Sequence, residues 1–143
     1  QWLQQFSDHQ FIQYSNQIID GEHANVRRRK ANVHGFKADL AASRAVICNT
    51  GFELISECLQ WRKPVLTRPL AKQMEQLSNA AALEQLGYAR TMLSLNTKTA
   101  RAWLDDIPEA PDVRFNNVAM ALAEWLARGA QKPVSELSQS LWQ

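Results

Sequence analysis

The residues best suited to do chemistry in this 143-residue chain form a short turn, Asn49-Thr50-Gly51. The apolar run AVIC at 45–48 before it is typical of a strand buried on both faces, and a helical pattern follows it. The first N–H groups of a helix lack partners and, with the helix dipole, favour an anion such as a phosphate. Gly51 has no side chain, so a ligand can approach the backbone. The alternative is a plain strand-to-helix turn with Asn49 or Thr50 as its cap.

Two glutamates, Glu53 and Glu57, lie one helical turn apart in the segment that follows. No lysine or arginine stands at helical spacing to pair with them, and like charges at this spacing repel by a few tenths of a kcal/mol. The positive helix N-terminus compensates Glu53, but Glu57 is a turn further in. One interpretation is that Glu57 faces a ligand with paired hydroxyls, since a carboxylate can accept two hydrogen bonds from a ribose diol. The other is a solvated acid.

A second polar pair, Glu75 and Gln76, stands in the first turn of the next predicted helix, from Gln73 to Leu86. Acids are common in a first turn because they complement the helix dipole, so the pair has an ordinary explanation as well as a binding one. Asn79 is less favourable inside a helix and is expected to bond to a neighbouring loop.

The basic run RRRK at 27–30 allows two interpretations. It can meet phosphates or an anionic membrane. Charges on an exposed edge strand more often protect that edge from pairing with another chain, and this is the favoured interpretation.

Length and composition set the class of protein. A chain of 143 residues, 45% hydrophobic and 21% charged, is long enough for one soluble domain with its own core, taken here as 1–143. A net charge of +2 gives no support for a nucleic-acid partner. Two cysteines, Cys48 and Cys58, make no disulfide framework and are expected in the core. The three histidines show no metal-ligand spacing, so neither a metal nor another cofactor is expected.

Strands and helices are predicted to alternate along the chain. The predicted strands lie at 9–15, 45–48, 63–69 and 88–93. The predicted helices start near Phe36, span Phe52–Trp61 and Gln73–Leu86, start at Asn96, run from an Asp112 cap to Arg128, and end the chain at Ser135–Trp142. Such alternation predicts an α/β fold, a Rossmann-like three-layer sandwich with a mostly parallel sheet. Parallel sheets bind ligands outside the carboxyl ends of their strands, where the loops CNTG and RPLAKQ would lie together.

Three stretches carry a combined pattern that resembles a known family. They are Val46-Ile47-Cys48-Asn49-Thr50-Gly51 with Glu57 six residues later, Lys63-Pro64-Val65-Leu66 with Pro69, and Glu75-Gln76-Leu77-Ser78-Asn79-Ala80. Their types and spacing resemble the donor-binding C-terminal domain of GT-B type glycosyltransferases, which have two Rossmann-like domains. The similarity is to the family of the peptidoglycan-precursor N-acetylglucosaminyl transferase and its uncharacterised relatives. About 45 residues carry it strongly, with weaker similarity from Phe36 to Gly87.

The resemblance implies a role for each matching residue. Asn49, Thr50 and Gly51 would lie against the diphosphate of a UDP-sugar donor, and Glu57 would hold its ribose diol. Phe36 and Lys37 would contact the uracil. Glu75 and Gln76 would contact the donor sugar or its phosphates. The resemblance also implies a cytoplasmic enzyme, at the inner face of the membrane if its acceptor is a lipid.

The chain departs from the family pattern in three ways. Arg62 stands where a glycine usually precedes Lys-Pro, and Asn49-Thr50 replaces smaller turn residues. The first strand of the donor domain with its Gly-rich loop, and the acceptor domain, have no counterpart here. We therefore expect a piece of a longer protein, with a sheet truncated at its N-terminal edge and no catalytic base. Alone it should be inactive and should self-associate, through apolar side chains near Phe11 or Trp142.

Two other functions remain open at this point. A non-catalytic donor-binding subunit of a split transferase would show the same motifs without a second domain. A nucleotide-sugar epimerase or hydrolase can share the fold but needs acid and base residues that the sequence does not reveal. Neither the sugar nor the acceptor can be read from these residues.

Overall fold

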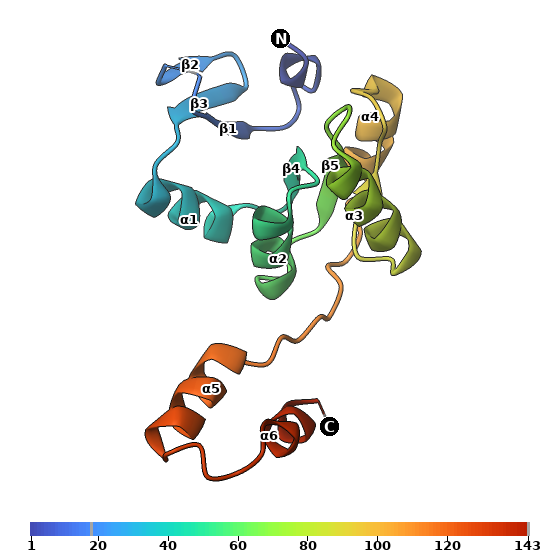
Figure 1. The fold of residues 1–143 in the computed structure, drawn as a ribbon. Helices are drawn as coiled ribbons and strands as arrows, with labels where there is room; N and C mark the ends of the chain where they lie inside the picture. Colours follow the sequence, from blue (N-terminus) through green and yellow to red (C-terminus); the bar gives the residue numbers. More distant parts are fainter. Residues whose placement is uncertain (18, 143) are drawn as a thin grey trace. The chain divides into compact units, whose positions relative to one another are not determined.

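A computed structural model describes residues 1–17 and 19–142. The chain divides into two compact units, residues 1–112 and residues 113–143, which are described one at a time (Figure 1). The first unit is mixed α/β, and within it three strands form a fully parallel sheet, as the alternation of strands and helices predicted.

A mixed sheet occupies the start of the first unit. Its strands are β1 (Phe11–Ser15), β2 (Gly21–His23) and β3 (Val26–Lys30), in the order β1-β3-β2. β1 is parallel to β3, and β2 is antiparallel to it. The basic run at 27–30 is thus the central strand of this sheet, so the expectation of a protective edge strand is wrong. The short strand β2 lies at the edge next to β3 instead.

The parallel sheet consists of β4 (Val46–Asn49), β5 (Val65–Arg68) and β6 (Arg90–Thr91) in that order. The central strand β5 is buried on both faces: Val65, Leu66 and Thr67 are each at most 2% exposed. Four helices alternate with these strands: α1 (Val33–Ala42), α2 (Phe52–Gln60), α3 (Met74–Gln85) and α4 (Thr97–Asp105). Since β4 and β5 run in parallel, the turns that lead into α2 and α3 leave the sheet at the same edge.

The core of the first unit joins its beginning to its end. The buried cluster consists of Phe6, Leu66, Met92, Ala100, Trp103 and Leu104. Phe6 follows a single 3-10 turn, Leu3–Gln5. The Asn25 amide nitrogen, from the loop before β3, lies 2.7–3.2 Å from the carbonyl oxygens of Leu3, Phe6 and His9 and holds this turn in place.

The buried face of α2 confirms the helical pattern predicted after the turn. Ile55, Cys58 and Leu59 are buried at spacings of three and four residues. Phe52, the first residue of the helix, is 69% exposed.

The backbone at Arg62, in the turn after α2, shows why a glycine suits this position, where the chain departs from the family pattern. Arg62 has φ +51°, in the left-handed region that a glycine adopts without a steric cost. Its neighbour Lys63 donates from Nζ to the carbonyl oxygens of Ala41 and Ser43, at 2.7 and 2.6 Å, and so caps the end of α1 with a cation. The family's glycine before Lys-Pro thus has a backbone reason.

We expect Arg62→Gly to be more stable than Arg62→Ala by about 1 kcal/mol, because only glycine relieves the left-handed strain. Both variants lose the same exposed ion pair, from Arg62 to Asp112 at 2.5 Å, so alanine is the matched control. Urea denaturation followed by circular dichroism measures the difference. An alanine variant as stable as the glycine variant would show that the turn carries no strain.

The second unit contains two helices, α5 (Val118–Ala127) and α6 (Val134–Leu141). The helix expected from Asp112 starts at Val118 instead, because the Asn117 side chain accepts the capping hydrogen bond from Met120. Trp125 Nε1 donates to the Lys132 carbonyl oxygen at 2.8 Å across the connection. None of the described residues of this unit is buried, and Trp142 is 66% exposed. Among the residues that the structure describes, no helix is both long and apolar enough to cross a membrane.

Candidate functional site

The three residues of the turn from β4 into α2 differ in how deeply they are buried. Asn49 is exposed, Thr50 is fully buried, and Gly51 is the N-cap of α2 with extended backbone angles. A Cβ added at Gly51 would meet no atom within 4 Å, so the fold itself does not require a glycine there. The missing side chain leaves open space beside the first N–H groups of the helix.

Helices α2 and α3 begin without a side-chain cap, at Gly51 and Gln73. The other two helices of the first unit are capped by asparagine: Asn32 accepts from Gly35 in α1, and Asn96 accepts from Thr99 in α4. The two uncapped ends both lie at the carboxyl edge of the parallel sheet. Their free N–H groups and helix dipoles together favour a bound anion at this edge.

Glu57 is the sixth residue of α2 and is half-buried. In the part of the chain that the structure describes, no side chain forms a hydrogen bond or ion pair with its carboxylate. The two nearest cations in sequence have other partners: Arg62 pairs with Asp112, and Lys63 donates its hydrogen bonds to the end of α1. The sequence showed no partner for Glu57 among its helical neighbours. Among the described residues, the structure shows none among its tertiary neighbours either. A half-buried carboxylate without a donor is free to accept hydrogen bonds from a ligand.

Glu75 and Gln76 are at the start of α3, at the same edge of the sheet. Glu75 is exposed, whereas Gln76 is half-buried and already bonded at both ends of its amide. Its oxygen accepts from the Leu70 N–H at 3.0 Å, and its nitrogen donates to the Gln73 oxygen at 2.7 Å. Gln76 therefore shapes the loop after β5, with one amide N–H left for a ligand.

Phe36 and Lys37 come from α1, beside the mixed sheet. The Phe36 ring makes an edge-to-face contact with Tyr14 of β1, at 5.1 Å between ring centres. The Tyr14 hydroxyl donates to Asp39 at 2.6 Å, and this arrangement attaches α1 to β1. Lys37 is exposed. The structure thus brings residues 49–51, 57 and 75–76 to one edge of the parallel sheet, while these two residues lie on a different element.

Two contacts hold Thr50 in the turn after β4; sequence reasoning predicted the first and missed the second. Asn79 of α3 places its amide nitrogen 3.5 Å from the Thr50 carbonyl oxygen, which is the expected bond to a neighbouring loop. The Thr50 hydroxyl lies 2.9 Å from that of Thr67 in β5. Thr50 therefore has no hydroxyl to offer a ligand, and only its backbone can take part.

The two cysteines are not nucleophiles. Burial raises the pKa of the Cys48 thiol to about 11. It raises that of Cys58 to about 12, with smaller contributions from Cys48 and Glu57. Because the thiolate is the reactive form, both thiols are inert at neutral pH, in keeping with their predicted place in the core.

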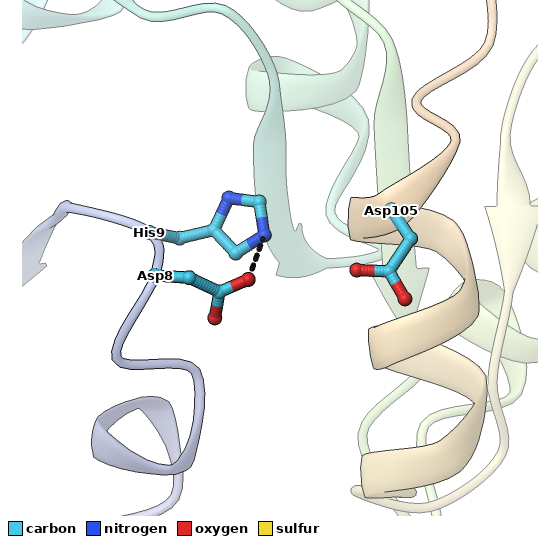
Figure 2. A group of neighbouring side chains, drawn as sticks. All are labelled: Asp8, His9 and Asp105. Atoms are coloured by element: carbon cyan, nitrogen blue, oxygen red, sulfur yellow. Dashed lines mark ion pairs between the residues drawn. The ribbon is translucent and has the colours of Figure 1, made fainter.

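A second group of ionisable residues lies away from this edge. Figure 2 shows Asp8, His9 and Asp105 brought together from the two ends of the first unit, with ligand-type atoms all within 4.8 Å. Arg101 Nη1 lies 2.7 Å from both Asp8 carboxylate oxygens and 3.6 Å from Asp105. The hydrogen bond from Arg101 holds the pKa of the Asp8 carboxyl below its usual range. A carboxylate already bonded to a guanidinium is a poor ligand for a cation, so this group is an ion-pair network.

Two of the four basic residues of β3 form ion pairs. Arg27 pairs with Glu22 at 2.8 Å, and Arg29 pairs with Asp39 at 3.2 Å. These arginines line an open hollow on the mixed sheet together with Asp20, Gly21, Glu22, Arg28 and Asn32. Its mixed charge makes it a weaker anion site than the uncapped helix ends.

Comparison with known proteins agrees with this geometry. A family model described as glycosyl transferase family 1 matches residues 1–108, which is 108 of the 143 residues and nearly the whole first unit. Neither the curated proteins nor the solved structures contain a match. The chain belongs to glycosyl transferase family 1.

Proposed function

We propose that this chain forms the nucleotide-sugar-binding part of an inverting glycosyltransferase that uses a UDP-linked sugar. The observation that carries the proposal is the arrangement of groups along α2. An uncapped helix end, with open space at Gly51, lies six residues before Glu57, a half-buried carboxylate without a partner among the described residues. A nucleoside diphosphate offers both complementary groups, since it has an anionic diphosphate and a ribose diol close together.

Each candidate residue then has a defined part. The backbone of Asn49, Thr50 and Gly51 would lie against the diphosphate, and Glu57 would accept two hydrogen bonds from the ribose. Glu75, with the free N–H of Gln76, would contact the donor sugar or its phosphates. Phe36 and Lys37 would contact the uracil, which requires the nucleoside to extend towards α1.

The chemistry of this site is stabilisation of a leaving group. In an inverting transfer the acceptor attacks the anomeric carbon, the bond to the diphosphate breaks, and negative charge develops on the diphosphate. Fixed N–H groups and the dipoles of α2 and α3 would stabilise that charge without reorganising. The base that takes the acceptor's proton would come from an acceptor domain. The motifs resemble those of the peptidoglycan-precursor N-acetylglucosaminyl transferase family and its uncharacterised relatives, and this resemblance supports a UDP-linked sugar as the donor.

Titration of the 143-residue chain with UDP by calorimetry tests this function, with uridine as the comparison. UDP should bind more tightly than uridine, because uridine lacks the diphosphate that the helix ends would bind. Equal affinity for the two would remove the diphosphate from the proposed site, and no binding of UDP would overturn the donor-binding function.

A further inference from the structure

Two fully buried threonines meet beneath the candidate diphosphate site. Thr50 ends the turn after β4, Thr67 lies in β5, and both side chains are 0% exposed. Their hydroxyl oxygens are 2.9 Å apart, within hydrogen-bonding distance. A valine would fill either position with nearly the same volume, so packing alone does not account for two hydroxyl groups in the core.

The hydrogen-bond donors in this pair can be assigned. Thr67 Oγ1 lies 3.1 Å from the Cys48 carbonyl oxygen, which can only accept. A hydroxyl has one proton to donate, so Thr67 donates to Cys48 and must accept from Thr50. The result is a directed chain from Thr50 through Thr67 to the backbone of β4. It ties the last residue before Gly51 to the central strand of the parallel sheet.

We infer that Thr50 and Thr67 are positioning residues for the first N–H groups of α2. Anchoring the Thr50 side chain inside the sheet leaves the following residue, Gly51, and the open space beside it on the outer side of the turn. The amide of Asn79, 3.5 Å from the Thr50 carbonyl oxygen, restrains the same residue from α3. Because the site would act through backbone N–H groups, their direction decides how well they bind an anion. This inference rests on the proposed function for its ligand, a nucleoside diphosphate.

The test compares Thr50→Val, Thr67→Val and the double variant in the 143-residue chain. Thr67→Val should be the least stable, because it leaves the buried Thr50 hydroxyl without an acceptor. The double variant should recover much of this loss, since no buried hydroxyl is then left unpaired. Its turn, however, is no longer tied to β5. We expect the Ile55 amide, which donates to the Gly51 carbonyl oxygen at 3.3 Å, to exchange with solvent about tenfold faster by NMR in the double variant, and the affinity for UDP to fall about tenfold.

Two matched variants separate positioning from stability. Thr50→Ser keeps the hydroxyl and should keep the wild-type exchange rate of the Ile55 amide. Thr91→Val removes the hydroxyl of another threonine, in the neighbouring strand β6, which donates to Glu84 of α3 at 2.8 Å. It should lower stability while leaving the Ile55 amide exchange and the UDP affinity unchanged.

A double variant with wild-type exchange of the Ile55 amide would overturn the positioning role and leave the pair a part of the core. Wild-type UDP affinity in a double variant with faster exchange would overturn it too, because the turn would then not matter for binding. If the wild-type chain does not bind UDP, the proposed function fails, and the amide measurements still decide whether the two hydroxyls hold the turn.

Discussion

Glu57→Gln should weaken UDP binding about ten- to a hundredfold. The substitution keeps the size and shape of the side chain but removes the charge that strengthens its hydrogen bonds to the ribose. Hydrogen bonds to a charged group contribute about 1.5–3 kcal/mol, which corresponds to this range of affinity. Calorimetric titration of the wild-type chain and the variant measures the change.

Folding should not suffer from this substitution. Glu57 forms no ion pair in the described part of the chain, so no internal contact is lost. Its repulsion with Glu53 disappears, and the melting temperature should hold or rise slightly.

Glu53→Gln is the matched control for Glu57. Glu53 is the exposed first-turn acid of the same helix, and its proposed role is to complement the helix dipole. Its replacement should cost about 0.3–1 kcal/mol of stability and little affinity. If both variants bind UDP as the wild type does, Glu57 is a solvated acid and the ribose assignment is wrong.

Phe6→Ala should lower the free energy of unfolding of the first unit by about 3–5 kcal/mol. Phe6 is 0% exposed and stands at the centre of the core cluster. Its ring contacts Trp2 and Phe11 edge to face, at 5.2 and 6.2 Å between centres, and the Arg101 guanidinium lies 5.0 Å over it. Alanine would leave a cavity between elements that cannot all move inward, which is the costly case. Since domains are stable by only about 5–15 kcal/mol, the loss is large.

Guanidinium denaturation followed by tryptophan fluorescence measures this effect, because Trp103 belongs to the same cluster. Phe52→Ala removes the same side chain from a position that is 69% exposed, so it should change stability by less than about 0.5 kcal/mol. A cost below about 1 kcal/mol for Phe6→Ala would show that the first turn of the chain is not part of the cooperative core.

Local patterns were enough to predict the elements that carry the site. The apolar run before Asn49, the helical spacing after Gly51 and the turn residue Gly87 each act within a few residues, so short windows of sequence contain the information. The strand β4, the helix α2 and the parallel pairing of β4 with β5 follow from them. The unpaired state of Glu57 towards its helical neighbours was visible for the same reason, since helical partners lie three or four residues away.

Tertiary structure decided which polar groups remain free for a ligand. The Thr50 hydroxyl looked available in the sequence but is bonded to Thr67, 17 residues later. The Gln76 amide is largely used by its own loop. The basic run at 27–30 became a central strand because β2 pairs with its outer side, and no pattern within the run marks that partner.

The core depended on the longest contacts of all. Phe6 packs with Trp103, and Asp8 pairs with Arg101, across more than 90 residues of chain. An apolar or charged residue has many possible partners of a suitable type along the chain. The geometry of the whole unit decides which of them it contacts. The sequence by itself determined the α/β class, the family motifs and the position of the helix that starts after Gly51. The burial of Thr50, the place of Phe36 against Tyr14 and the strain at Arg62 arose only when distant segments packed together.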